Sequence, residues 1–245
     1  YVNGFFSETY SKGSLLKSRA EEFDLSGFGF LKNKVRRISR LNTDGNFQKA
    51  YRLLSPKIDV FEISENTTVD VLEFSTSNNS SFQRCTFRIA SNVEVVVRQR
   101  VKSTKEFKGF CGQELNFDLE TKASCFLISG QKTQSDQNSL VRINAKLSKE
   151  AIFENALFIE CGAANRWEVE AQATGSNARI NLLGAYKVKE GGHLDLRPQA
   201  LHNSGESHSR QLYKGFVSRK AKAVFNGRIF IDQDMQKVDS SMYNR

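Results

Sequence analysis

The chain has 245 residues, of which 39% are hydrophobic, and its 19 phenylalanines are ample for a packed core. No apolar run approaches the roughly 18 residues of a membrane-spanning helix, and residues 1–13 lack the pattern of a secretory signal, so membrane and secreted proteins are disfavoured. The net charge of +9 would suit nucleic acid, but the basic residues are dispersed except over 32–40, and no recognisable binding motif accompanies them.

The first segment, residues 1–54, differs in pattern from the rest. Apolar residues recur at helical spacing over 15–23, Ser14 can cap this helix, and two glycines follow it closely. A second short helical piece is expected over 47–54. We therefore expect a helical N-terminal segment, followed by a separate core over 55–245.

From residue 58 onward the chain consists of short runs with period-two alternation, bounded by Asn, Ser, Gly and Asp, which is typical of half-buried strands. The runs cover 58–63, 69–74, 82–89, 93–97, 115–119, 140–143, 156–159, 167–169, 178–182, 193–196 and 228–231. No convincing helical pattern interrupts them, so an all-β core is predicted, either a sandwich or a solenoid of stacked rungs.

Several features favour the solenoid. The strands are short and many, the loops are polar, and the chain has only two prolines. Asn followed by a small residue recurs before apolar pairs at Asn155, Asn177 and Asn226, as expected for corners of a β-helix. The interval from Asn155 to Asn177 would fit one coil, although the interval from Asn177 to Asn226 is more than twice as long and makes the period irregular.

The four cysteines form no C-x-x-C motif. Cys85 and Cys125 lie in apolar, strand-like runs and are interpreted as buried free thiols, and Cys161 is interpreted as structural because no histidine lies near it in the sequence. Disulfides are not expected, which favours a reducing, cytoplasmic location.

The three histidines, His193, His202 and His208, lack a third or fourth converging ligand, so no metal site is predicted, and they are interpreted as surface or loop-anchoring residues. No nucleophile elbow, phosphate-binding loop or dinucleotide motif is present, and no catalytic residue is assigned.

A carbohydrate-active β-helix enzyme is an alternative, with Asp195, Asp232 and Asp234 as candidate acids. These acids are not framed by aromatic sugar platforms, since Trp167 is the only tryptophan. A basic nucleic-acid-binding module is the second alternative, and it would show steeply salt-dependent affinity.

Residues 139–245 resemble the SufB/SufD family of iron–sulfur cluster assembly proteins. The resemblance is carried by ordered motifs: Arg179-x-x-Leu182-x-Gly184, His202, Ser209-Arg-Gln-Leu-Tyr-Lys-Gly215, Ala221-Lys-Ala-Val-Phe-Asn-Gly-Arg-Ile229, Gln236-Lys-x-Asp239 and Asn244-Arg245. The N-terminal segment looks like the helical lead-in of the SufD branch. SufB-type chains usually carry a Cys where this chain has Glu170-Ala-Gln-Ala-Thr-Gly175, so the resemblance is to SufD rather than SufB.

The resemblance implies a right-handed parallel β-helix core and a non-catalytic scaffold subunit of a complex with a SufB-like scaffold and a SufC-like ATPase. A homodimer is the alternative to the heterodimer, and neither nucleic acid nor membrane is expected as a partner. No cofactor is expected on the residues present, and an iron–sulfur cluster would form at the interface between subunits.

The chain begins without Met, and its strand pattern breaks off at Arg245, so we expect a fragment whose family domain continues beyond that residue. The family's key Cys and His would lie in the continuation. Of the residues present, Asn226, Gly227, Lys237 and Asp239 are the candidates for the partner interface, the alternative being that they are corner and ladder residues of the fold.

Overall fold

The computed structural model describes residues 35–41, 58–75, 80–103, 107–133 and 136–245. The short helices predicted over 15–23 and 47–54 lie outside these ranges. Between them, the described part of the N-terminal segment is a strand, β1.

The described residues form strands and turns without a helix, which confirms the all-β prediction. The strands are β1 (Val35–Leu41), β2 (Ile58–Ile63), β3 (Thr67–Ser75), β4 (Ser81–Ile89), β5 (Glu94–Ser103), β6 (Phe110–Leu119), β7 (Ser124–Lys132), β8 (Asn138–Leu147), β9 (Ile152–Cys161), β10 (Ala164–Ala173), β11 (Arg179–Val188), β12 (His193–His202), β13 (His208–Val217), β14 (Lys222–Phe225), β15 (Arg228–Ile231) and β16 (Asp239–Asn244). The predicted runs fall on these strands but are mostly shorter than them.

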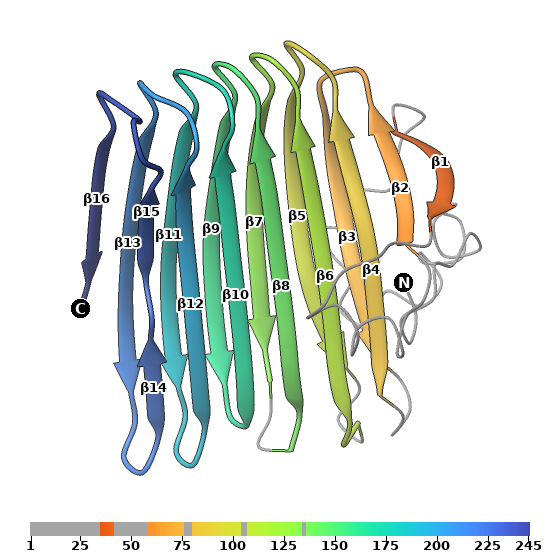
Figure 1. Ribbon diagram of the computed structural model, residues 1–245. Helices are drawn as coiled ribbons and strands as arrows, with labels where there is room; N and C mark the ends of the chain where they lie inside the picture. The colour runs from red at the N-terminus through yellow and green to blue at the C-terminus, as the bar shows by residue number, and fades with distance from the viewer. Residues whose placement is uncertain (1–34, 42–57, 76–79, 104–106, 134–135) are drawn as a thin grey trace.

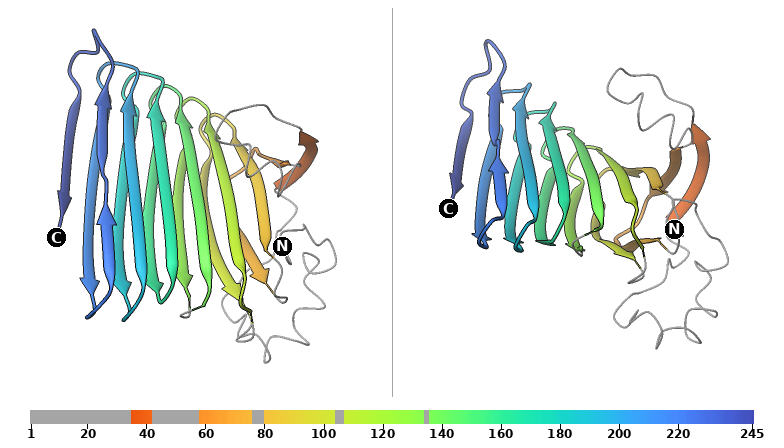
Figure 2. Two further views of the ribbon diagram at one scale, coloured as in Figure 1. Left: turned by 60° about the horizontal axis from the view of Figure 1, so that its bottom comes forward. Right: turned by 90° about the horizontal axis from the view of Figure 1, so that it is seen from below.

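The strands form two sheets that alternate along the chain. Sheet B has the order β1-β2-β4-β6-β8-β10-β12-β14, with β15 also paired to β12, and sheet A has the order β16-β13-β11-β9-β7-β5-β3. Every described pair is parallel except β1 with β2. Each rung therefore contributes one strand to each sheet, and Figures 1 and 2 show the rungs stacked in a row from β1 and β2 to β16. This arrangement is a parallel β-solenoid, and the sandwich is excluded.

The register defines the length of one rung. Asp59 pairs with Cys85 on the next rung, and Ser209 pairs with Ser240, so one coil is longer than the interval between Asn155 and Asn177. The coil suggested by those two asparagines is wrong, because they are not equivalent. Asn155 is buried within β9 and pairs with Leu182, whereas Asn177 lies in the turn before β11 with a φ of 58°.

The core lies between the sheets, where alternate residues of each strand point inward and stack on their counterparts in the next rung. Phe61, Phe87 and Phe117 form one such stack, with ring centroids 5.4 and 5.3 Å apart. Burial of these columns links each rung only to its neighbours, so the stability of the fold depends on contacts between rungs.

Part of the interior is polar. In the first rungs the Gln113 amide donates to Gln83 Oε1 at 2.5 Å and accepts from Gln99. Further along, Trp167 Nε1 donates to Gln131 Oε1 at 2.9 Å. These side chains are all buried, and their mutual hydrogen bonds offset the cost of removing polar groups from water.

The turns from sheet B to sheet A also stack. From the turn between β4 and β5 onward, each contains a residue with positive φ at this place, and the column runs through Asn92, Lys122, Glu150, Asn177, Glu206 and Lys237. Backbone bonds join successive members or their neighbours, such as Lys122 N to Lys149 O at 2.9 Å. Asn adopts this conformation readily, but for Lys and Glu it is held by the stacked turns.

Candidate functional site

The four predicted interface residues all lie on the last rung, at two separate places. Asn226 and Gly227 occupy the gap between β14 and β15, and Asn226 N donates to Leu196 O of the preceding rung at 2.9 Å. Lys237 lies in the turn that leads into β16, and Asp239 is the first residue of that strand. The structure thus places the four on one rung but does not bring them together as a cluster.

Each of these residues continues a column of the solenoid. Lys237 Nζ is 3.2 Å from Glu206 Oε1 of the preceding turn, and Asp239 Oδ2 is 3.8 Å from His208 Nδ1. A Cβ at Gly227 would lie 2.3 Å from Met242 Sδ and 2.7 Å from the Phe225 ring, so a side chain there would displace both. Their positions are therefore those of corner and ladder residues, and any role at an interface would be additional.

A charged ladder on the outer face of sheet B was not predicted from the sequence. We define it as the residues at one register position in successive rungs: Arg84, Glu114, Arg142, Glu168 and Arg197. The charges alternate in sign along this column, so each residue faces an opposite charge on the next rung. Asn226, in the gap between β14 and β15, occupies the position after Arg197.

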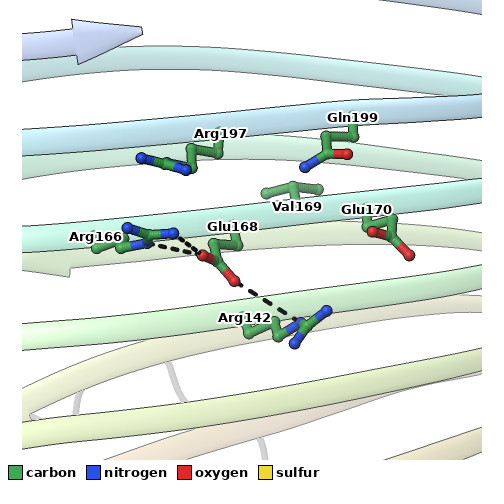
Figure 3. Close-up of a pocket in the computed structure, with 7 residues that line it drawn as sticks. All are labelled: Arg142, Arg166, Glu168, Val169, Glu170, Arg197 and Gln199. Atoms are coloured by element: carbon green, nitrogen blue, oxygen red, sulfur yellow. Dashed lines mark hydrogen bonds and ion pairs between the residues drawn. The ribbon is translucent and has the colours of Figure 1, made fainter. Parts of the chain in front are cut away.

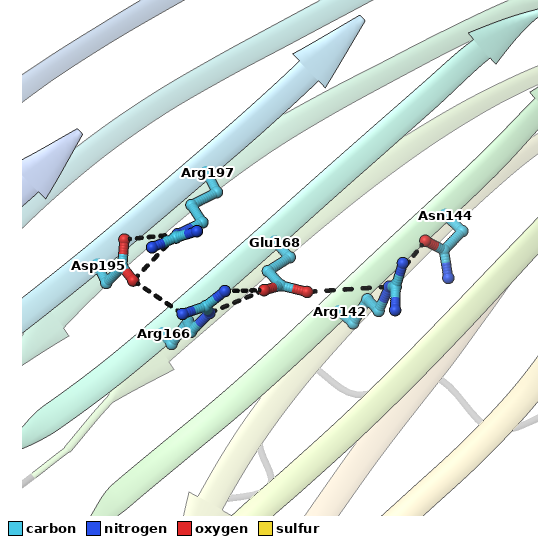
Figure 4. Close-up of polar contacts among 6 residues, drawn as sticks. All are labelled: Arg142, Asn144, Arg166, Glu168, Asp195 and Arg197. Atoms are coloured by element: carbon cyan, nitrogen blue, oxygen red, sulfur yellow. Dashed lines mark hydrogen bonds and ion pairs between the residues drawn. The ribbon is translucent and has the colours of Figure 1, made fainter. Parts of the chain in front are cut away.

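Neighbouring side chains extend the charged ladder sideways (Figure 4). Arg166 contacts both Glu168, at 2.5 Å, and Asp195, at 3.2 Å, and Arg197 Nε lies 3.0 Å from Asp195 Oδ1. Hydrogen bonding to Asp195 raises the pKa of Arg197 above its ordinary value. A misregistered rung would place like charges side by side, so the charged ladder favours one register.

A hollow of about 200 Å³ lies over the charged ladder (Figure 3). It is lined by Arg142, Arg166, Glu168, Val169, Glu170, Arg197 and Gln199. Arginine and carboxylate groups alternate around it and bond one another, so the charges are largely compensated within the protein. This surface is suited to holding rungs in register rather than to attracting an anion.

The geometry does not support the alternative of a carbohydrate-active enzyme. Asp195 accepts hydrogen bonds from two arginines, so its carboxylate oxygens are already engaged and are poorly placed to deliver a proton to a sugar. Trp167 is fully buried between the sheets and cannot form a sugar platform. Asp232 accepts a bond from Gln233 N in the turn after β15.

His202 anchors the turn between β12 and β13, as the interpretation of loop-anchoring histidines predicted. Its ring is fully buried, with Nδ1 2.6 Å from Ser207 Oγ and Nε2 2.9 Å from Ser209 Oγ. Ser207 donates its one hydroxyl proton to Ser204 O at 2.8 Å, so it accepts from Nδ1–H, and Nε2 accepts from Ser209. Both ring nitrogens are therefore satisfied with the ring neutral, whereas His193 and His208 are exposed.

We expect His202 to make stability depend on pH. Burial, assisted by the nearby His208, lowers the pKa of His202 in the folded state, so the unfolded chain binds more protons as the pH falls through the ordinary histidine pKa. The stabilisation is complete above the unfolded pKa of about 6.5 and is lost as the pH falls through the lower folded value. In thermal melts the Tm of the wild-type protein should fall between about pH 7.5 and about pH 5. The fall should be smaller in the His202→Gln variant, because that variant lacks the buried titrating group.

The matched control is His193→Gln, because His193 is exposed on the same strand. An unchanged pH dependence in the His202→Gln variant would contradict the assignment.

Two cross-strand pairs of glycine and tyrosine explain motif residues that carry the family resemblance. Gly184 of β11 is paired with Tyr213 of β13, and Tyr186 of β11 with Gly215 of β13, so the pairing is reciprocal. A Cβ at Gly184 would lie 2.3 Å from the Tyr213 ring, and one at Gly215 would lie 2.0 Å from the Tyr186 ring. Each ring thus covers the backbone of a glycine in the adjacent rung.

Gly184→Val should destabilise the protein by about 1–3 kcal/mol, because the new side chain overlaps the Tyr213 ring within a packed interior. The free energy of unfolding, measured by urea titration, checks this. In a double-mutant cycle Tyr213→Ala should recover part of the loss caused by Gly184→Val, and strictly additive losses would contradict the contact.

All four cysteines are free and buried, as predicted for Cys85 and Cys125. Burial raises the pKa of the Cys125 and Cys111 thiols and raises that of Cys161 to about 11, so these three remain protonated at neutral pH. A protonated buried thiol is a poor nucleophile and a poor metal ligand.

Among the described residues, no three His, Cys, Asp or Glu side chains are grouped so that they could hold a metal ion. No helix among these residues has the length and apolar character needed to span a bilayer.

The fold and these contacts define a parallel β-solenoid with a filled interior, in which the motif residues bind one rung to the next. The chain belongs to the family whose model is described as "SUF system FeS cluster assembly, SufBD core domain", which matches residues 72–245. It is similar to the iron–sulfur cluster assembly protein SufD of Escherichia coli (strain K12), with 26% identity over 166 residues. That alignment covers 68% of this chain and 39% of the relative's length.

Proposed function

We propose that the chain is the solenoid core of a SufD-like subunit in iron–sulfur cluster assembly, acting with SufB-like and SufC-like subunits. The observation that carries this proposal is the family match over residues 72–245, which runs from within β3 to the end of β16. The similarity to SufD of Escherichia coli favours the SufD branch.

The proposed role is that of a scaffold rather than a catalyst. Polar groups that could do chemistry are engaged inside the fold: His202 is hydrogen-bonded through both nitrogens, and Asp195 is held by arginines. The iron–sulfur cluster is the cargo of the complex, and we place its assembly at the interface between subunits. The free thiols are compatible with a reducing cytoplasm.

We place the partner contact at the last rung, near Asn226, Gly227, Lys237 and Asp239. This placement is supported by the exposure of Asn226, Lys237 and Asp239, whose side chains bond at most to the preceding rung.

Anaerobic co-expression of the full gene product with the SufB-like and SufC-like proteins of the same source tests the function. We expect one complex on size exclusion that contains all three proteins. Failure to associate with either partner would overturn the proposed function.

Lys237→Glu tests the placement of the partner contact separately. We expect this variant to reduce co-elution, while Lys122→Glu should not, because Lys122 occupies the same turn position on an earlier rung and also contacts a Glu. Normal co-elution of the Lys237→Glu variant would overturn the placement but leave the function intact.

A further inference from the structure

The outer face of sheet A carries an apolar stripe that crosses four rungs. Ile128, Ala156, Leu183 and Leu212 lie in register on β7, β9, β11 and β13. We define the apolar stripe as these four residues together with Phe126, Phe158 and Ala185, which point out of the same strands beside them. Phe126, Phe158 and Leu183 are 37%, 57% and 36% exposed, and the strands that carry them, β7, β9 and β11, lie in the middle of the row of rungs.

The outer face of sheet B differs sharply from this one. The positions there that face solvent are occupied mainly by the later members of the charged ladder, Arg142, Glu168 and Arg197, and by amides that bond across rungs, such as Asn144 to Asn116 at 2.8 Å. That pattern is typical of a sheet face that remains in water. A contiguous apolar patch on a sheet face marks a surface that another body covers.

A basic row follows one side of the apolar stripe. Lys132, Glu160 and Lys187 occupy one register position on β7, β9 and β11, while Lys214 on β13 is paired with Ala185. Lys189 follows β11 and contacts Glu160 at 2.7 Å. We define the basic row as the four lysines Lys132, Lys187, Lys189 and Lys214. Glu160 is the one acid in their register column, and the surrounding lysines, Lys189 first, lower its pKa, which agrees with a positive local field.

The geometry of the apolar stripe fits a helix rather than a strand. A strand adds to the edge of a sheet, whereas this surface is a face. Successive rungs are about 4.8 Å apart, so the apolar stripe is ~14 Å long between β7 and β13. A helix rises about 5.4 Å per turn, so one apolar residue per turn would meet about one rung, and about ten residues would span the apolar stripe.

From these observations we propose that the outer face of sheet A docks an amphipathic helix of a partner protein, with the helix's apolar side on the apolar stripe and acidic residues facing the basic row. A second copy of this chain is a poorer occupant, because it would bring another protein of net charge +9 with the same basic row. The proposal does not depend on the function proposed above.

A synthetic peptide provides the probe. It has roughly 14 residues, with Leu at helical i, i+3, i+4 and i+7 spacing and Glu beside them, and its binding to the protein is followed by fluorescence anisotropy. We expect saturable binding that a scrambled peptide of equal composition lacks. Phe158→Ser and Lys187→Glu should each weaken binding by about tenfold, whereas the control Lys146→Glu, on the outer face of sheet B, should not.

A charge exchange separates docking from general stickiness. The Lys187→Glu/Lys214→Glu variant should no longer bind the acidic peptide, and it should bind a version of the peptide in which every Glu is replaced by Lys. The proposal is overturned if the scrambled peptide binds equally, or if no saturable binding occurs at millimolar peptide. It is also overturned if sedimentation shows that the protein is a dimer and that Leu183→Glu makes it a monomer. A further contrary result would be that anionic phosphatidylglycerol vesicles bind through the apolar stripe and the basic row, whereas the peptide does not bind.

Discussion

Replacing Glu114 with glutamine is expected to lower the free energy of unfolding by about 3–5 kcal/mol. Arg84 Nε lies 3.1 Å from Glu114 Oε2, and the two side chains are only 1% and 3% exposed. The variant leaves the guanidinium buried without the Glu114 carboxylate, and the loss of this compensating charge is the main cost. Urea titration of the wild-type and variant proteins measures the loss.

Two comparisons make the Glu114 prediction specific. The Arg84→Met/Glu114→Leu double variant should be more stable than Glu114→Gln, because it removes both buried charges together. Lys132→Gln, which breaks an exposed pair with Glu160, should cost less than about 1 kcal/mol. A Glu114→Gln loss as small as that of Lys132→Gln would contradict the account of the buried pair.

Trp167→Ala should likewise cost about 3–5 kcal/mol, since it removes the largest fully buried side chain of the described interior. The indole stacks in register between Val141 and Leu196, and its Nε1 donates to Gln131 Oε1. Trp167→Phe should cost less, because it keeps most of the volume and loses chiefly the hydrogen bond. Urea titration again provides the measurement.

The matched control for Trp167 is Phe158→Ala, which removes an aromatic ring from a residue that is 57% exposed on the outer face of sheet A. It should change the free energy of unfolding by no more than about 0.5 kcal/mol. If Trp167→Ala were equally mild, the interior would not be packed as described.

Local pattern was sufficient to predict most strands, because inward and outward residues alternate within a single strand. The runs 58–63 and 228–231 coincide with β2 and β15, and 82–89 falls within β4. The period of the rungs could not be read in the same way. Asn serves both in turns, as at Asn177, and in the buried interior, as at Asn155, so its recurrence gave a coil that is too short.

The charged ladder could not be predicted for a related reason. Its members lie a whole coil apart in the sequence, and nothing in the local sequence around Arg142 or Glu168 distinguishes them from other exposed charges. Their relation appears only once the register is known. Conversely, the sequence does reveal motif residues with structural roles: Gly184 and Gly215 pack rungs together, and His202 anchors a turn within one rung.

Iron and acid-labile sulfide content tests the central claim, that the protein is a scaffold subunit for cluster assembly, most directly. The samples are the anaerobically purified full gene product alone, its SufB-like partner alone, and their complex with the SufC-like ATPase. We predict that the gene product alone holds little iron and sulfide. The complex should hold more of both than the SufB-like partner holds by itself. Equal cluster content with and without this subunit would contradict its role as a scaffold.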